Sequence, residues 1–244
     1  MGAGEFSLRL QQQFWNRWNA DTREKSVAKV SLEQTDVVLS WLRRIGKRDL
    51  DIIDVGCGAG WLCPHLTEFG RVTGTDLSDE VLGRAAARFP EVNYVAGDFM
   101  ALEFGQGNFD VVVSLEVLSH VADQPAFIEK ISSLLRPGGY FIIGTPNKPA
   151  LMRNNIPPPE PGQLRHWVDR HELQELLGTQ FEVLEMRSIT PVFNRGLLRI
   201  PNSYKLNHLA SALKLSPVTN LVKKAQERAW LGWTLMALAT KRAP

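Results

Sequence analysis

The sequence of 244 residues predicts an α/β fold built on a doubly wound, mostly parallel sheet. From Leu50 onward, short apolar runs bounded by Gly, Asp or Pro alternate with longer amphipathic stretches, which is typical of strand–helix units. A domain of roughly 100 to 200 residues also has room for one well-buried core. We therefore expect a single core with small additions.

The first 46 residues predict a helical cap. Residues 8–45 contain no Pro or Gly and carry apolar side chains at helical spacing, so two helices fit before Gly46. Ser31 and Gln34 have the spacing of a capping box that would begin the second helix. We expect this cap to cover residues 1–46.

Residues 47–190 predict the core of the sheet. We expect strands at 50–55, 71–76, 92–96, 109–114, 139–145 and 181–190. The helices between them are expected at 60–69, 79–88, 124–135 and 169–178. The turn Arg136-Pro137-Gly138-Gly139 ends the third of these helices, because Pro and Gly do not continue a helix. Right-handed crossovers should connect the parallel strands.

Two segments interrupt this pattern. Six prolines fall within residues 146–161, and a loop of that length is typically functional or disordered. Residues 191–230 carry seven Lys or Arg and one Glu, a net charge of +6 that leaves −4 on the rest of the chain. We expect this stretch to be a helical cap insertion, followed by the final strand of the core within residues 231–244, at Leu231 to Lys241.

Composition excludes several classes of protein. The net charge of +2 creates no large field for nucleic acid, and Cys57 and Cys63 cannot form a disulfide framework. The N-terminus has no signal-peptide pattern, and the longest apolar run, Ala229 to Thr240, has about half of the ~20 residues that a membrane-spanning helix needs. We expect a cytoplasmic protein without a spanning segment. No His/Cys cluster has metal-ligand spacing, so we expect no metal.

The strongest functional signal lies where the first strand turns into the first helix of the core. The sequence there is Asp54-Val55-Gly56-Cys57-Gly58-Ala59-Gly60. Glycines let the backbone turn sharply and approach a ligand, and a helix N-terminus offers N–H groups to a negative group. Residue 61 is Trp, so the dinucleotide fingerprint G-x-G-x-x-G is absent and a carboxylate is favoured over a pyrophosphate. A tight turn without a ligand would explain the same glycines.

Two acids follow at the ends of the next strands. Asp76 lies 22 residues after Asp54, where an acidic residue accepts hydrogen bonds from ribose hydroxyls. Alternatively Asp76 caps the next helix, although Ser78 is available for that role. Asp98 ends the third strand and is placed to accept from an adenine amino group, with Phe99 or Leu77 against the base. A solvated loop acid is the alternative for Asp98.

These motifs resemble, in order, those of class I S-adenosylmethionine (SAM) dependent methyltransferases. The resemblance covers residues 50–145 and rests on five segments, which are Asp54 to Gly60, Gly74-Thr75-Asp76-Leu77-Ser78, Gly97-Asp98-Phe99, Phe109-Asp110-Val111-Val112 and Leu135-Arg136-Pro137-Gly138-Gly139. The stretch Ser114-Leu115-Glu116-Val117-Leu118-Ser119-His120-Val121 is similar to the ubiquinone-biosynthesis and small-molecule O-methyltransferase branch. The resemblance implies a Rossmann-like, seven-stranded sheet whose last strand is antiparallel.

The same resemblance implies that SAM is the cofactor and S-adenosylhomocysteine the product. It assigns the methionine end of SAM to the loop Gly56 to Gly60, the ribose to Asp76, and the adenine to Asp98 and Phe99. Further cofactor-binding candidates are Asp54, Cys57, Leu77 and Glu116. Methyltransferases of nucleic-acid bases usually carry an Asn/Asp/Ser-Pro-Pro-aromatic motif where Ser114-Leu115-Glu116-Val117 stands, so nucleic acid is not an expected partner.

His120 and His166 are the candidate general bases. Displacement at a sulfonium methyl needs mainly an aligned nucleophile, and a hydroxyl nucleophile also benefits from a group that accepts its proton. His120 lies four residues after Glu116, which we expect to contact the cofactor or to orient the substrate. His166 follows the Pro-rich loop, which would close over the site. The alternative for His120 is packing under the site and capping a short helix, and for His166 it is packing in the loop.

We therefore expect methyl transfer to an oxygen of a small, ring-containing acceptor. N- or C-methylation of a similar molecule is the alternative, and a non-catalytic SAM-binding module is the alternative of another class. The basic insertion, including Lys223 and Lys224, would attract an anionic group of the acceptor or an anionic membrane surface, or it is a solvated helical face. The oligomeric state stays open.

Overall fold

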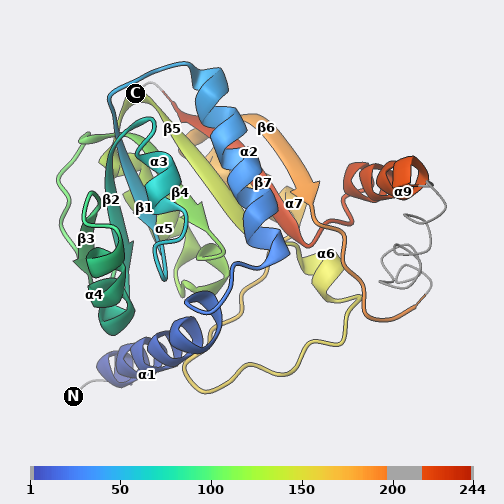
Figure 1. Cartoon of the computed structure of the whole chain (residues 1–244), viewed down its shortest axis with the longest axis horizontal. Coiled ribbons are helices and arrows are strands. Elements are labelled where there is room, and N and C mark those ends of the chain that lie inside the picture. The colour runs from blue at the N-terminus through green and yellow to red at the C-terminus, as the bar shows by residue number, and fades with distance from the viewer. Residues whose placement is uncertain (1–2, 197–215, 243–244) are drawn as a thin grey trace.

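A computed structural model describes residues 3–196 and 216–242 of the chain (Figure 1). The described part contains a seven-stranded sheet in the order β3-β2-β1-β4-β5-β7-β6. The strands are β1 (Leu50–Val55), β2 (Gly70–Asp76), β3 (Asn93–Ala96), β4 (Phe109–Leu115), β5 (Leu135–Pro146), β6 (Phe181–Ile189) and β7 (Thr234–Lys241).

The direction of the strands confirms the predicted doubly wound sheet. Strands β3, β2, β1, β4 and β5 pair in parallel, whereas β7 pairs antiparallel with both β5 and β6. The strand order reverses between β1 and β4. In open α/β sheets, ligands bind outside the carboxyl ends of the strands at such a reversal.

Helices cover both faces of the sheet (Figure 1). One apolar cluster joins the sheet to α2 (Lys29–Ile45), α3 (Cys63–Leu66) and α4 (Asp79–Arg88), with Trp41 and Leu42 fully buried. A second cluster joins the other face to α5 (Gln124–Leu134) and α7 (Arg170–Gly178). Burial of these apolar residues stabilises the sheet and fixes the positions of its carboxyl ends.

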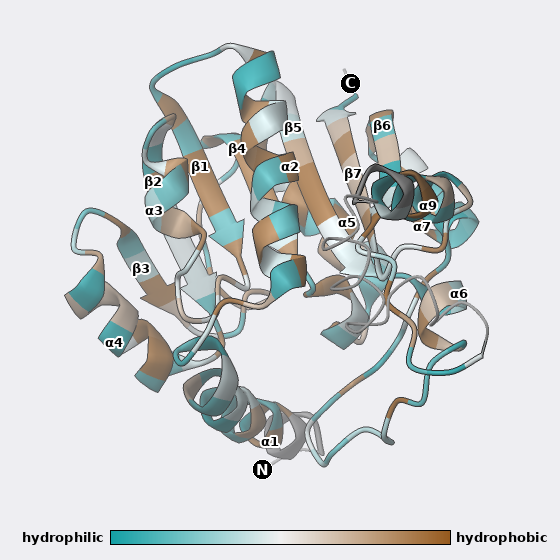
Figure 2. Ribbon diagram, turned by 45° about the vertical axis from the view of Figure 1, so that its right-hand side comes forward, coloured by the Kyte–Doolittle hydropathy of each residue, from teal (hydrophilic) through white to brown (hydrophobic). Residues whose placement is uncertain are grey.

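The N-terminal segment lies across the carboxyl ends of the strands (Figure 2). It consists of α1 (Ala3–Trp18) and the π-helical turn η1 (Asn19–Arg23), and α2 follows it. The two expected N-terminal helices are therefore present. A π-helical turn is uncommon and frequently marks a functional site.

Two local predictions were wrong. The helix expected at 60–69 is limited to Cys63–Leu66, because turns of the glycine-rich loop occupy the preceding residues. Helix α2 begins at Lys29, and its N-cap residue Ala28 has no side-chain bond, so Ser31 and Gln34 form no capping box. Both side chains are buried within the helix and bond to distant residues instead.

The basic insertion is described only in part. Its residues 197–215, including Arg199, Lys205 and Lys214, lie outside the described residues. Helix α9 (Ser216–Arg228) contacts β6, and Lys223 pairs with Glu33 of α2 at 2.7 Å. Across residues 3–196 and 216–242, every helix is too short or too polar to cross a membrane.

Candidate active site

A cavity of about 830 Å³ lies at the carboxyl ends of β1, β2 and β4, under the N-terminal segment. Cavities of this size hold small molecules and cofactors. Its wall contains ten of the residues singled out from the sequence, which are Asp54, Gly56, Cys57, Gly58, Asp76, Leu77, Asp98, Phe99, Glu116 and His120. Gly60 and His166 are not part of this wall.

The glycine-rich loop needs its glycines at the cavity. Gly56 and Gly58 adopt φ angles of +75° and +56°, which side chains rarely tolerate. A Cβ atom on Gly56 would lie 2.1 Å from Val117 Cγ2, and one on Gly58 would lie 3.0 Å from Asn19 Oδ1. The N–H of Gly56 donates to the carbonyl of Thr75 at 2.7 Å, which fixes the loop to β2.

Gly60 serves packing beneath the loop. Its φ is +72°, and a Cβ there would lie 2.4 Å from the Tyr94 hydroxyl oxygen. That hydroxyl is buried and has no hydrogen-bond partner among the described residues. The third glycine thus lets the loop lie directly on Tyr94.

Two backbone donors orient the carboxylate of Asp76. Its Oδ2 accepts from the N–H of Gly58 at 2.8 Å, and its Oδ1 accepts from the N–H of Ser78 at 2.8 Å. Ser78 is the N-cap residue of α4, but its hydroxyl accepts from Asn19 at 2.9 Å instead of capping the helix. Each carboxylate oxygen can accept a second bond, so Asp76 is suited to receive two ligand hydroxyls.

Asp98 and Phe99 form a fixed edge of the cavity. Asp98 Oδ1 accepts from the N–H of Met100 at 3.0 Å. The ring of Phe99 packs edge to face on Phe127 at 5.5 Å, and Lys130 Nζ lies 5.3 Å from its centre. These contacts place an apolar ring beside a carboxylate. A planar base can pack on such a ring while its amino group donates to the carboxylate.

Asp54 is buried in the wall, with 3% of its surface exposed. Burial raises the pKa of Asp54 to about 7, the bond from Cys63 Sγ at 3.4 Å opposes this rise, and the charge of Asp76 adds to it. A ligand ammonium group beside Asp54 would favour the ionised carboxylate. Asp54 is therefore suited to a cationic group.

Glu116 follows the last residue of β4 and anchors a polar cluster in the cavity wall. Its φ of +65° is unusual for a residue with a side chain, and such strain gathers at functional sites. Oε1 accepts from Gln34 Nε2 at 2.6 Å and from Thr234 Oγ1 at 2.8 Å. Burial raises the pKa of Glu116, and the bond from Thr234, the charge of Arg23 and the bond from Gln34 oppose the rise.

His120 is held as a neutral imidazole. Its Nδ1 lies 2.6 Å from the carbonyl oxygen of Leu164, so Nδ1 carries the proton and Nε2 keeps a lone pair. Burial lowers the pKa of His120 to about 4, the bond to Leu164 opposes this, and the charge of Arg165 adds to it. Nε2 is therefore a hydrogen-bond acceptor at physiological pH.

The lowered pKa of His120 predicts a pH-dependent stability. The unfolded chain takes up a proton on His120 below pH ~6.5, whereas the folded protein takes it up only near pH 4, so stability falls over this interval by up to about 3 kcal/mol. The variant His120→Gln should lack this part of the loss. Denaturant titrations of both proteins between about pH 4 and pH 8 measure it, and parallel curves would contradict the shift.

Aromatic side chains form much of the remaining wall. Five of the seven tryptophans line the cavity, namely Trp15, Trp18, Trp61, Trp167 and Trp233. Trp15 and Trp18 of α1 stand edge to face at 5.6 Å. Aromatic faces attract cations and stack on planar rings, so this wall suits a sulfonium group and a ring-shaped acceptor.

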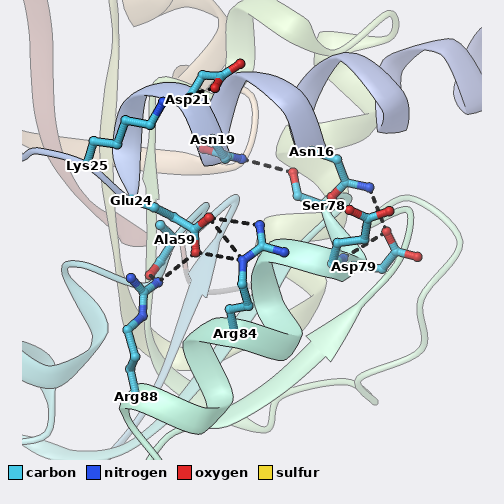
Figure 3. A network of polar contacts seen from close by, with 11 residues as sticks. Asn16, Asn19, Asp21, Glu24, Lys25, Ala59, Ser78, Asp79, Arg84 and Arg88 are labelled. Carbon is cyan, nitrogen blue, oxygen red and sulfur yellow. Dashed lines mark hydrogen bonds and ion pairs between the residues drawn. The ribbon is translucent and has the colours of Figure 1, made fainter.

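A polar network fixes the N-terminal segment to α4 and to the glycine-rich loop (Figure 3). Glu24 accepts from Arg84 Nη2 at 2.8 Å and pairs with Arg88 at 3.4 Å. Arg88 also donates to the carbonyl of Ala59 at 3.1 Å. Arg88 thus connects Glu24, which follows η1 above the cavity, to the glycine-rich loop in the cavity wall.

His166 lies at the surface beside the site. Its N–H donates to the carbonyl of Ser119 at 2.8 Å, and its carbonyl accepts from Gln124 Nε2 at 2.9 Å. The Pro-rich loop lines the cavity through Pro146, Leu151 and Ile156, and the two neighbours of His166, Arg165 and Trp167, line it as well. Within the described ranges, no three His, Cys, Asp or Glu residues are grouped to hold a metal ion.

Sequence comparison relates the chain to SAM-dependent methyltransferases. The family model described as "Methyltransferase domain" matches residues 53–143. A probable S-adenosylmethionine-dependent methyltransferase of Mycolicibacterium smegmatis is 33% identical over 54% of this chain, a match that spans about half (52%) of that relative. The ubiquinone biosynthesis O-methyltransferase of Xanthomonas euvesicatoria pv. vesicatoria is 31% identical over 81% of this chain and 88% of the relative.

Solved structures share the fold. N-methyltransferase NodS of Bradyrhizobium japonicum, in complex with S-adenosylhomocysteine, has a TM-score of 0.65 at 16% identity and covers 96% of this chain and 100% of its own. A second structure is the 1,6-didemethyltoxoflavin-N1-methyltransferase of Burkholderia thailandensis with bound 1,6-didemethyltoxoflavin and S-adenosylhomocysteine. It has a TM-score of 0.65 at 18% identity, and the match covers 100% of this chain and 92% of that structure's chain. At these identities the likeness concerns the fold.

Proposed function

Because this chain belongs to the class I SAM-dependent methyltransferases, we propose that it transfers a methyl group to a hydroxyl oxygen of a small, ring-containing molecule. The name of the Xanthomonas relative, an O-methyltransferase, supports oxygen as the target. The neutral imidazole of His120 carries the proposal, since it offers an unprotonated nitrogen within the cavity.

The residues of the cavity fit SAM. The paired oxygens of Asp76 suit the two ribose hydroxyls, and Gly56 and Gly58 leave a cradle that side chains would fill. Phe99 and Asp98 suit the adenine, and Asp54 suits the ammonium group. When bound, SAM supplies a methyl group on a sulfonium cation, which the aromatic wall accommodates.

His120 would accept the proton of the acceptor hydroxyl. As the new C–O bond forms, that proton becomes strongly acidic, so an imidazole of low pKa is basic enough to take it. Trp15 packs on the His120 ring at 4.6 Å and would hold a planar acceptor next to Nε2. Alignment by this wall and proton acceptance by His120 are the protein's contributions to transfer.

A matched pair of acceptors tests the target atom. Catechol and o-phenylenediamine share one ring and differ in offering oxygen or nitrogen, and mass spectrometry with methyl-labelled SAM locates the label. We expect label on the oxygen of catechol, and a loss of about 100-fold in kcat in His120→Gln. His65→Ala, an exposed histidine outside the cavity, is the control with unchanged kcat. Label on nitrogen alone, or an unchanged kcat in His120→Gln, would contradict the proposal.

A further inference from the structure

Arg23, the last residue of η1, lines the cavity, and its guanidinium forms no ion pair within residues 3–196 and 216–242. An arginine side chain has five N–H donors. One of them, on Nη1, donates to Ser31 Oγ. In the described ranges no second acceptor bonds to Arg23, and no carboxylate lies within ion-pair distance of it. Most of its donors therefore remain for a ligand.

The surroundings of Arg23 favour an anionic ligand. Burial lowers the pKa of Arg23, and the charge of Glu116 only opposes this effect. Glu116 already receives Gln34 and Thr234 on one oxygen, and burial raises its pKa, which limits how far it offsets the cation. A partly buried cation without a paired anion costs free energy, and the planar guanidinium matches a carboxylate with two parallel bonds.

Arg165, the other arginine of the cavity wall, differs from Arg23 in this respect. Its Nε and Nη2 donate to Gln163 Oε1 at 3.0 Å and 2.5 Å. Its Nη1 donates to the carbonyl of Pro157 at 2.5 Å. The donors of Arg165 thus serve the Pro-rich loop, whereas those of Arg23 are available.

A continuous row of rings connects Arg23 to the candidate base. The guanidinium carbon of Arg23 lies 5.2 Å from the centre of the Trp18 ring. Trp18 lies 5.6 Å from Trp15, and Trp15 lies 4.6 Å from His120. All four side chains line the cavity. Contacts between neighbouring side chains thus link Arg23 to His120 through Trp18 and Trp15 along the cavity wall.

The following inference rests on the proposed function. We propose that the acceptor is an aromatic molecule that carries a carboxylate, or a comparable anion, on the side of the ring away from its reacting hydroxyl. The ring lies on Trp15 and Trp18, the hydroxyl donates to His120 Nε2, and the anion accepts from Arg23. The charge of residues 191–230 suggested that Lys223 and Lys224 attract an anionic group of the acceptor. These two lysines do not line the cavity, and the proposal gives that role to Arg23 instead. SAM also carries a carboxylate, so the test separates the two sources.

The test compares 3,4-dihydroxybenzoate with 3,4-dihydroxybenzamide, which differ in charge and little in shape. Each is titrated into the full chain saturated with S-adenosylhomocysteine, with calorimetry as the readout. We expect the acid to bind about 10- to 100-fold more tightly than the amide, as for a hydrogen-bonded charge pair. Arg23→Gln should bring the ratio to about one and leave the affinity for S-adenosylhomocysteine unchanged. Arg23→Lys should keep part of the preference, because it keeps the charge.

Arg17→Gln is the matched control, since Arg17 lies on α1, is exposed and pairs with Glu160 outside the cavity. Equal binding of acid and amide by the wild-type protein would overturn the inference. So would an Arg23→Gln variant that loses affinity for S-adenosylhomocysteine and keeps its preference for the acid, because Arg23 would then serve the carboxylate of the donor. The titration needs no turnover, so acid binding through Arg23 without methylation would contradict the proposed function alone.

Discussion

The substitution Asp76→Asn is expected to weaken SAM binding about 100-fold. Each oxygen of Asp76 accepts one backbone N–H, from Gly58 and from Ser78, and still faces the cavity. An amide has one oxygen, so its NH₂ group would oppose one of these N–H groups, and the charge-assisted bonds to ribose would be lost. Together these effects amount to about 3 kcal/mol. Calorimetric titration with SAM measures the change.

Asp79→Asn is the matched control for this experiment. Asp79 lies three residues further on, is exposed, and accepts from Asn16 Nδ2 at 2.9 Å outside the cavity wall. Its replacement should leave the affinity for SAM within about threefold, since an exposed bond of this kind is worth little. Wild-type affinity in Asp76→Asn would rule out Asp76 as the ribose ligand.

Gly56→Ala is expected to abolish measurable SAM binding and to lower the free energy of unfolding by about 2 to 4 kcal/mol. The φ of +75° disfavours any side chain, and the new Cβ would lie 2.1 Å from Val117 Cγ2. The loop must move away from Val117, which removes the cradle for the ligand. Denaturant titration and calorimetry report the two effects separately.

Two further variants identify the cause of this effect. Gly83 lies in α4, and a Cβ atom added to it would meet no other atom within 4 Å, so Gly83→Ala should stabilise the protein by up to about 1 kcal/mol. The double variant Gly56→Ala with Val117→Ala removes the contact and keeps the backbone strain, so it should regain part of the stability. Equal stability of Gly56→Ala and the wild type would show that the loop has room for a side chain.

The sheet and the donor side of the cavity could be predicted from the sequence because their signals are local. Asp76 is the last residue of a short strand, Gly56 and Asp98 come just after two others, and parallel strands bring their carboxyl ends to one edge. Five motifs in order therefore specify positions in space as well as along the chain.

Apart from His120, the polar residues around Glu116 and Arg23 could not be predicted in this way. Arg23, Gln34 and Thr234 come from η1, α2 and β7, and the contact between Gln34 and Thr234 joins residues 200 positions apart. No local motif records such a contact. One signal was present, because Gln34 stands at helical spacing from the buried Val38 and Trp41, where a polar side chain needs a partner. The capping-box interpretation assigned that side chain to the wrong task.

The bond from Arg88 to Ala59 bears on the line of attack in the reaction. In the proposed transfer, the acceptor oxygen, the methyl carbon and the sulfur must be collinear, and a displacement of 1 Å can reduce the rate about 100-fold. Trp15 and Trp18 belong to the N-terminal segment, whereas the loop under the donor belongs to the sheet. Glu24 and Arg88 connect these two layers, so their contacts restrain the movement of one layer relative to the other. In the proposed reaction, this connection would keep the acceptor aligned with the methyl group of the donor when either layer moves.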